Sequence, residues 1–289
     1  MRILILGSKG QIGDHLNIFL KNKKHQVYGL DILNSSSEDL RKDNNKKLIF
    51  LIKKVDFVFF LAFDVGGSLY LKNYQDSYNF KMNNILIMKN VFVQLFKTKK
   101  KFIFASSQMS NMNYSSYGTL KKIGENLTES IGGITVRFWN IFGIERDLKK
   151  THVITDFILK GIKSNKVLMR TNGMEERDFM YADDCCAALE LIMKKYSFFK
   201  NKKTIDLNTG KFTKIKKVAS IISSLFLEQG RVVQFIPSNK KDDLQLNKKN
   251  KSNKFLLKYF KPKFSLQQGI KKVFNYYISK KNFFIKTFR

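Results

Sequence analysis

A short apolar run that ends in spaced glycines, RILIL followed by GSKGQIG, opens the chain. The run is too short for the apolar core of a signal peptide and is typical of a buried first strand. Glycines at 7, 10 and 13 allow a tight turn and a close backbone approach to a ligand, and the helix that follows supplies amide donors. The segment therefore predicts a pyrophosphate site formed by Gly7, Gly10, Gln11, Ile12 and Gly13. Its GxxGxxG spacing departs from GxGxxG, so the prediction of a pyrophosphate site needs support from other residues.

Strand-like and helical stretches alternate along the first half of the chain, which predicts a parallel sheet with crossover helices. Strands are expected at 3–6, 26–30, 57–61, 102–105 and 134–137, and helices at 11–23, 46–54, 77–96 and 116–130. Later elements are a strand and helix within 178–194, with Asp183 or Asp184 as the helix cap, a strand at 205–208 and a helix at 266–277.

This order predicts an α/β fold, a Rossmann-like doubly wound parallel sheet with a smaller C-terminal α/β substrate-binding region. We assign residues 1–140 to the Rossmann domain and expect 178–210 to return to it. Residues 141–177 and 211–289 form the substrate-binding region, and the lysine-rich segment 240–254 is expected to be a solvated loop.

Asp31 ends the second expected strand, 18 residues after Gly13. A carboxylate at that place can accept hydrogen bonds from the adenosine ribose and repels a 2′-phosphate. The position favours NAD over NADP, although an aspartate that only caps the loop would fit the same pattern.

Tyr117 and Lys121 stand four residues apart in YGTLK and so share one face of a helix. An ammonium beside a phenol stabilises the phenolate, which predicts that Lys121 lowers the pKa of Tyr117 and makes it a usable base. Alone, the pair could be an ordinary surface pair. Together with the glycine loop, it predicts oxidoreductase chemistry on a nicotinamide cofactor.

Six segments in this order resemble the extended short-chain dehydrogenase/reductase family, in particular its nucleotide-sugar epimerases and dehydratases. They are GSKGQIG, FFLAF, ASS, YGTLK, VRFWNIFG and RDFMYADD. The resemblance implies that Ser107 and Tyr117 bind the reacting substrate oxygen, with Ser106 as the fallback for Ser107. It implies that Tyr117 moves the hydroxyl proton and that Lys121 binds the nicotinamide ribose.

Further roles rest on the same resemblance. Leu61 and Ala62 match the strand end along the cofactor, and Asn83, or else Asn84, matches an asparagine that orders the active-site backbone. Asn140 and Arg177 match positions that bind the substrate diphosphate, although Arg177 could instead pair with Asp178 or Asp183. Asp39 matches an acid near the adenine or is a surface charge.

The chain also departs from the family pattern. Ser107 and Tyr117 are only ten positions apart, so a loop that carries substrate contacts is short. Gln108 and Met109 stand where a 4,6-dehydratase has an aspartate and a glutamate, which disfavours dehydration. The DVGG segment resembles fucose-synthase-like enzymes, whose additional acid/base pair is a cysteine and a histidine. Met109 replaces that cysteine, and His152 is either the histidine or a packing residue.

The residues and the resemblance favour an NAD-dependent nucleotide-sugar epimerase. A reductase or epimerase-reductase of a nucleotide-activated keto sugar is the alternative, and a non-catalytic dinucleotide-binding protein is a second one. The family also implies a homodimer through the helices at 77–96 and 116–130.

The net charge of +31 could indicate a nucleic-acid or membrane partner. Because lysines are spread along the chain, we expect neither partner and read the charge as solvated surface, with the lysine-rich stretch 248–263 as the remaining candidate for a basic patch. The longest apolar run, FVFFLAF, is far below the ~20 residues of a membrane span. Cys185 and Cys186 are adjacent and fit a reducing compartment, so we expect a cytoplasmic protein without a structural disulfide or metal.

Overall fold

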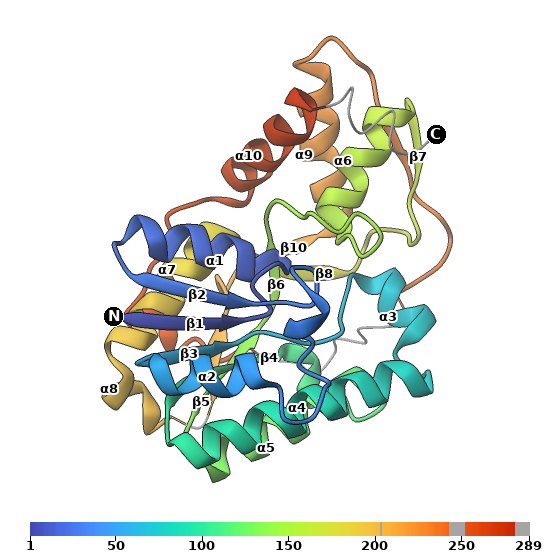
Figure 1. Ribbon diagram of the computed structural model, residues 1–289. Coiled ribbons are helices and arrows are strands. Elements are labelled where there is room, and N and C mark those ends of the chain that lie inside the picture. The colour runs from blue at the N-terminus through green and yellow to red at the C-terminus, as the bar shows by residue number, and fades with distance from the viewer. Residues whose placement is uncertain (203, 243–251, 281–289) are drawn as a thin grey trace.

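The computed structural model describes residues 1–202, 204–242 and 252–280. Its centre is a parallel sheet of six strands within this described part, in the order β2-β1-β3-β4-β5-β9 (Figure 1). The strands are β1 (Arg2–Leu6), β2 (Gln26–Leu30), β3 (Phe57–Phe60), β4 (Lys101–Ser107), β5 (Ile134–Phe138) and β9 (Thr204–Leu207). This sheet confirms the predicted fold class.

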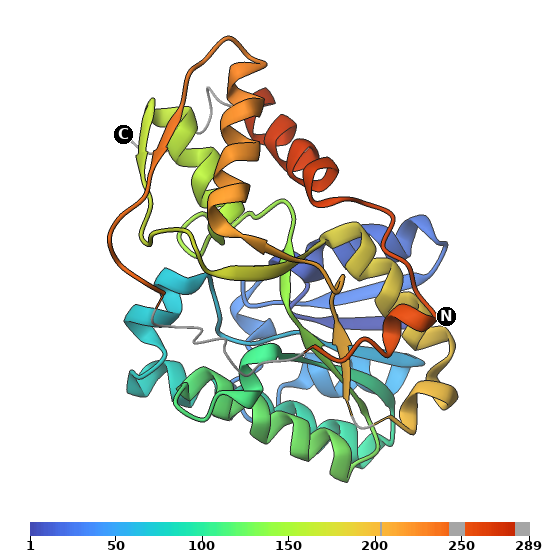
Figure 2. The ribbon, with the colours of Figure 1, turned by 180° about the vertical axis from the view of Figure 1, so that it is seen from behind.

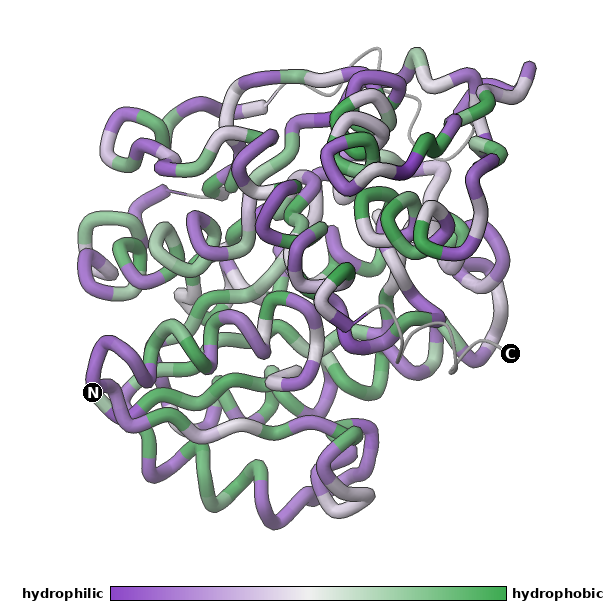
Figure 3. Tube along the Cα trace, turned by 90° about the horizontal axis from the view of Figure 1, so that it is seen from above, coloured by the Kyte–Doolittle hydropathy of each residue, from purple (hydrophilic) through white to green (hydrophobic). Residues whose placement is uncertain are grey.

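Helices cover both faces of the sheet, and the inner strands β1 and β3 are buried throughout apart from Arg2. Ile3 and Ile5 pack toward the face covered by α1 (Gln11–Asn22), α7 (Ala182–Lys194) and α8 (Tyr196–Lys200). Leu4 and Leu6 pack toward the other face, which is covered by α2 (Lys46–Lys54), α4 (Tyr78–Thr98) and α5 (Ser116–Ser130). Such two-sided burial is expected of a parallel strand. Figure 3 shows apolar segments through the interior of the molecule.

A smaller lobe with its own apolar core stands above the sheet in Figure 1 and, from behind, in Figure 2. It contains α6 (Val153–Lys163), α9 (Ile215–Leu227), α10 (Leu266–Ser279) and the two-stranded sheet of β7 (Lys166–Leu168) and β11 (Gln234–Ile236). A three-stranded sheet, β10-β8-β6, connects the lobe to the central sheet. Its strands are β6 (Asn140–Phe142), β8 (Glu176–Tyr181) and β10 (Phe212–Lys214).

The expected strands and helices are all present, with ends that differ by at most two residues. The predicted cap of α7 is wrong. The helix begins at Ala182 after Tyr181, so Asp183 and Asp184 lie inside its first turn. Asp184 instead accepts hydrogen bonds from the backbone N–H groups of Lys263 and Phe264, 2.8 and 2.9 Å away, because the chain leading to α10 passes this point.

Residues 178–210, which we expected to return to the first domain, divide between two sheets. β9 pairs with β5 at the edge of the central sheet, whereas β8 pairs with β6 and β10. The domain boundaries therefore stay a prediction. Of the lysine-rich segment 240–254, residues 243–251 lie outside the described residues. Among the described residues, no helix combines the length and apolar character that a bilayer span needs.

Candidate active site

A cavity of about 1220 Å³ lies between the carboxyl ends of the central strands and the smaller lobe. Strand order reverses between β1 and β3, and open parallel sheets form their ligand crevice at such a reversal. The cavity brings together all the predicted site residues. They are Gly7, Gly10, Gln11, Ile12, Gly13, Asp31, Leu61, Ala62, Asn83, Ser107, Tyr117, Lys121, Asn140 and Arg177.

The glycine loop has the close backbone packing that a dinucleotide site requires, because there is no room for a side chain at its glycines. Gly7 has a φ of +84°, and a Cβ on it would lie 2.8 Å from the backbone of Ala62. A Cβ on Gly13 would lie 2.0 Å from the carbonyl oxygen of Gly7. The turn thus brings α1 directly against the end of β1, with its first amides open to the cavity. Gln11 adds a buried Nε2 that has no partner among the described residues, as expected of a donor toward a bound ligand.

Asp31 lies in this cavity beside the glycine loop. Its carboxylate accepts hydrogen bonds from the backbone N–H groups of Lys9 at 2.8 Å and Leu33 at 3.0 Å. Each oxygen keeps a further lone pair that a ribose hydroxyl can use. The buried Glu38 supports this turn by accepting from the N–H of Asp31 at 2.9 Å.

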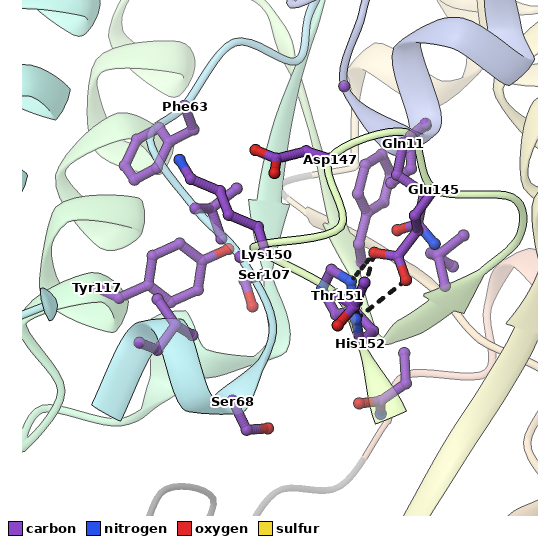
Figure 4. A pocket seen from close by; sticks show the side chains of 18 of the residues that line it. Gln11, Phe63, Ser68, Ser107, Tyr117, Glu145, Asp147, Lys150, Thr151 and His152 are labelled. Atoms are coloured by element: carbon purple, nitrogen blue, oxygen red, sulfur yellow. Dashed lines mark hydrogen bonds and ion pairs between the residues drawn. The ribbon is translucent and has the colours of Figure 1, made fainter. Parts of the chain in front are cut away.

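Helix α5 carries Tyr117 and Lys121 and packs very closely on its neighbours. A Cβ on Gly118 would lie 2.2 Å from the carbonyl oxygen of Met109, and a Cβ on Gly124 would lie 2.3 Å from the ring of Phe104. Gly124 lets the helix approach β4 closely, and Gly118 lets it approach the turn that follows β4. Tyr117 and Lys121 are consequently buried at the sheet end, 7% and 3% exposed. In Figure 4 the Tyr117 hydroxyl is directed toward Ser107.

The predicted pairing of Lys121 with the Tyr117 phenol does not occur in this structure. The ammonium donates to the carbonyl oxygen of Ala105 at 2.6 Å and lies 3.7 Å from the centre of the Phe63 ring. Burial raises the pKa of Tyr117 to about 12, although a hydrogen bond to Ser107 opposes the rise. Burial lowers the pKa of Lys121 to about 7, against the charge of Glu125. Helical spacing correctly predicted a common face but could not predict where the long side chain ends.

Glu125, one helical turn after Lys121, organises the floor of the site. Its carboxylate accepts from the hydroxyls of Ser106 and Ser110, both at 2.7 Å, and from Nε and one terminal nitrogen of Arg137, both at 2.6 Å. Burial raises the pKa of Glu125, but Arg137 and the two serines outweigh it and hold the pKa below its usual value. Because the Ser106 hydroxyl donates to Glu125, Ser107 is the serine that lies beside Tyr117.

The two adjacent asparagines of α4 have different partners. Asn84 is fully buried and brackets the backbone of Asp64, accepting from its N–H at 2.7 Å and donating to its carbonyl oxygen at 3.1 Å. Asn83 lines the cavity, donates to the Asp64 carboxylate at 3.0 Å and accepts from Arg41 at 2.9 Å. Backbone ordering in this region therefore comes from Asn84, the alternative to the predicted Asn83.

The substrate side of the cavity contains paired charges that sequence spacing did not reveal. Arg177 forms an ion pair with Asp242, and neither of the two alternatives, Asp178 or Asp183, is its partner. Asp178 is occupied by Thr209 and Gly210. Asn140 lines the same wall, and its side-chain amide lies 3.5 Å from the carbonyl oxygen of Asp178.

Glu145 and His152 form a second titratable pair in the cavity, across from Tyr117 in Figure 4. The imidazole Nδ1 lies 2.6 Å from a Glu145 oxygen, and the His152 backbone N–H donates to the same carboxylate at 3.0 Å. Burial lowers the pKa of His152, but the charge and hydrogen bond of Glu145 outweigh it and raise the pKa. The sequence contained one signal for this pair, the isolated histidine before an apolar helix.

Charges around the cavity nearly balance. Its described lining contains ten lysines and arginines and nine aspartates and glutamates. The surplus of the chain, +31 in total, therefore lies almost entirely outside the ligand site.

Comparison with known proteins agrees with this geometry. The sequence profile of the NAD-dependent epimerase/dehydratase family matches residues 3–208. The CDP-abequose synthase of Salmonella muenchen is 23% identical over 94% of this chain and 96% of its own. A UDP-glucose 4-epimerase of Thermotoga maritima, solved with UDP-glucose, superposes with a TM-score of 0.79 at 18% identity and covers 97% of this chain and 99% of its own. A GDP-6-OMe-4-keto-L-xylo-heptose reductase from C. jejuni superposes with a TM-score of 0.79 at 20% sequence identity. The match covers 96% of this chain and 98% of its own.

Proposed function

The chain belongs to the NAD-dependent epimerase/dehydratase family, and from that premise we propose that it is an epimerase of a nucleotide sugar. It is an enzyme, and its cofactor is NAD. One observation carries the proposal. Ser107 and Tyr117 lie together in the cavity that also contains the glycine loop and Asp31.

Each site residue has a separate role in the proposed reaction. Ser107 and Tyr117 bind one ring hydroxyl of the sugar, and Tyr117 accepts its proton and later returns it. NAD, when bound, would supply the hydride acceptor and donor for the ring carbon that carries this hydroxyl. Lys121 supplies positive charge at the site, and its ammonium has N–H donors beyond the one used by Ala105. The net result is inversion at one carbon.

Proton removal requires a phenolate, and the pKa of about 12 keeps Tyr117 protonated in the ligand-free protein. We therefore propose that ligand binding turns the Lys121 ammonium from Ala105 toward the phenol. Lys121 is suited to that movement because only one hydrogen bond, 2.6 Å long, holds its Nζ among the described residues.

Asn140 and Arg177 are the proposed diphosphate contacts. The pairing of Arg177 with Asp242 leaves the guanidinium oriented, since Arg177 also donates to the carbonyl oxygen of Glu176 at 2.7 Å. A preoriented guanidinium binds phosphate oxygens with less loss of side-chain entropy.

A keto-sugar reductase or epimerase-reductase is the second candidate, favoured by the Glu145–His152 pair. His152 gives the cavity a second group that can donate or accept a proton, and the similar C. jejuni structure is a keto-heptose reductase. Dehydration is disfavoured, because Gln108 and Met109 offer neither an acid nor a base beside Ser107.

Incubation with a panel of nucleotide sugars, followed by NMR of the products, tests these candidates. An epimerase converts one sugar into its epimer without net consumption of NAD, whereas a reductase consumes NADH or NADPH in proportion to product. Tyr117→Phe should lower kcat about 1000-fold while the NAD affinity changes little, because only the proton-transfer group is removed. Unchanged turnover in this variant would refute the assigned role. Binding of NAD without turnover of any sugar would support the non-catalytic alternative.

We also propose a homodimer through α4 and α5. Their outer faces expose Ile85, Val93 and Phe96, and Ile123 and Leu127, each between 39% and 67% exposed. Adjacent apolar side chains on two neighbouring helices are a typical interaction surface. Phe96→Asp should shift the mass measured by light scattering from dimer to monomer, and a monomeric wild-type protein would contradict the proposal.

A further inference from the structure

The connection between β6 and α6, residues 143–152, crosses the cavity and is tied at both ends. We call these residues the strap. At its start, the backbone N–H of Ile144 donates to His15 Nε2 at 3.1 Å, and Arg146 Nε donates to Asp14 at 2.9 Å. His15 and Asp14 belong to α1, the helix that follows the glycine loop.

The far end of the strap is attached to the loop after β3. Lys150 Nζ lies 2.9 Å from an oxygen of Asp64, and the Lys150 carbonyl oxygen accepts from the backbone N–H of Gly67 at 2.9 Å. The contact is close, since a Cβ on Gly67 would lie 2.1 Å from the carbonyl oxygen of Thr151.

Several groups bind the Asp64 carboxylate at this end of the strap. Its carboxylate also accepts from the hydroxyl of Tyr70 at 2.6 Å and from Asn83 at 3.0 Å. Lys150 Nζ lies 4.3 Å from the centre of the Tyr70 ring as well. Burial raises the pKa of Asp64, but these hydrogen bonds and Lys150 outweigh it and hold the pKa below its usual value. The carboxylate is thus ionised and oriented toward the strap.

The two halves of the strap differ in how firmly they are held. Tyr277 of α10 is fully buried, and its hydroxyl bonds both the N–H and the carbonyl oxygen of Glu145, each at 2.9 Å. The Lys150 end is held by one backbone hydrogen bond, from Gly67, and by an ion pair whose side chains are 33% and 17% exposed. The Lys150–Asp64 pair is therefore the charged contact that closes this end of the strap.

The strap begins close to the glycine loop, since a Cβ on Gly143 would lie 2.8 Å from Nε2 of His15, two residues after Gly13. The attachment points are α1, which follows β1, and the loop after β3, and β1 and β3 are neighbours in the sheet. Glu145, Arg146, Asp147 and Lys150 line the same cavity as the glycine loop, and Figure 4 shows Gln11 on the same side of it as Glu145. A dinucleotide held at the glycine loop would consequently be covered from the side of the smaller lobe.

We infer that Asp64 and Lys150 are positioning residues that hold the strap over bound NAD, so that their ion pair must open before the cofactor leaves. The inference uses the family cofactor but not the proposed epimerase activity. A closed strap would keep bound NAD from exchanging with solvent.

Stopped-flow displacement of NADH by excess NAD, followed by NADH fluorescence, tests the inference. Lys150→Met removes the ammonium and keeps the alkyl stem, and it should raise the NADH dissociation rate about tenfold, the loss of one charge-assisted hydrogen bond. Asp64→Asn should have a similar effect, and the double variant should add little, because both changes remove the same interaction. Lys149→Met is the matched control, since this exposed neighbour does not line the cavity.

Hydrogen exchange of the NADH complex provides the second readout. Amides at 148–151 should exchange faster in Lys150→Met than in Lys149→Met, and Lys150→Arg should restore slow exchange. Wild-type dissociation rates in both Lys150→Met and Asp64→Asn would overturn the inference, as would equal acceleration by Lys149→Met. Because both readouts follow the dinucleotide, an absence of epimerase activity would leave the result unaffected.

Discussion

In the half of the cavity that faces the central sheet, backbone atoms fit against one another with no room for a side chain at Gly7, Gly13 or Gly118. In the half that faces the smaller lobe, pairs of opposite charge hold the wall, as in Arg177–Asp242 and His152–Glu145. The first half we call the cofactor half and the second the substrate half. The difference implies that the cofactor half is fixed by steric fit and burial, and the substrate half by electrostatic pairs that a ligand can rearrange.

Replacement of Glu125 should give the largest effect on stability and tests the burial of the cofactor half. Glu125→Ala leaves Arg137, whose side chain is 14% exposed, without its carboxylate. Loss of one partner of a buried pair costs about 4 kcal/mol in the free energy of unfolding. Urea unfolding measures this value, and Glu125→Gln should lose less because it keeps the hydrogen-bonding shape. A change below 1 kcal/mol for Glu125→Ala would show that water reaches this network.

The next largest effect on stability is expected from a methyl group added to the glycine turn, which tests the steric fit of the cofactor half. Gly13→Ala places a Cβ 2.0 Å from a backbone oxygen, so it should cost about 3 kcal/mol and weaken NAD binding. Gly230→Ala is the control, because its φ is +72° but nothing lies within 4 Å. It should cost about 1 kcal/mol from backbone strain alone and leave NAD affinity unchanged. Calorimetric titration with NAD and thermal unfolding measure both effects, and equal results for the two variants would contradict steric fit.

Replacement of Lys121 should show that its buried ammonium destabilises the ligand-free fold. Its folded pKa of about 7 lies below the unfolded value of ~10.4, so between these pH values the unfolded chain binds more protons. Stability should therefore fall as the pH falls from 10 to 7. Lys121→Met should remove this dependence, raise the free energy of unfolding at pH 7 by about 2 kcal/mol and abolish turnover.

Chemical unfolding at pH 7, 8.5 and 10 gives the comparison, with Lys122→Met as the control. Lys122 is half exposed and pairs with Glu125 at 3.3 Å, so its loss should change stability little. An unchanged pH dependence in Lys121→Met would mean that water or a partner solvates the ammonium.

The smallest effect is expected in the substrate half. Glu145→Gln keeps the shape of the side chain but removes the charge that raises the pKa of His152. The stabilisation from this pair is complete below the unfolded histidine pKa of ~6.5 and is lost as the pH rises through the higher folded value. With a His152 side chain 41% exposed, Glu145→Gln should cost about 1 kcal/mol at pH 6 and less at pH 9. A loss as large as that of Glu125→Ala would end the distinction between the two halves.

The sequence predicted what depends on short-range geometry. The glycines, Asp31, and the helix with Tyr117 and Lys121 were placed correctly in one cavity, because strand ends and helical periods fix their positions. It did not predict where side chains separated by long stretches of sequence would meet. The Glu125–Arg137 pair and the Arg177–Asp242 pair join residues 12 and 65 positions apart.

Two failures have specific causes. The phenol was expected to be acidic, but burial dominates at Tyr117 and the ammonium of Lys121 is directed to a carbonyl. Asp183 and Asp184 are good cap residues, yet α7 begins before both of them and the later chain uses Asp184 as an acceptor. In each case a tertiary contact outweighed a local preference.

The near balance of charge around the cavity has a consequence for salt dependence. Fields of exposed surface lysines decay over about 10 Å at 0.1 M ionic strength, so they contribute little inside an electrically compensated pocket. Affinity for an anionic ligand should then vary only weakly with added sodium chloride, even though the whole molecule should be retained strongly by a cation-exchange resin. Adsorption and ligand recognition are thereby separate properties of this chain.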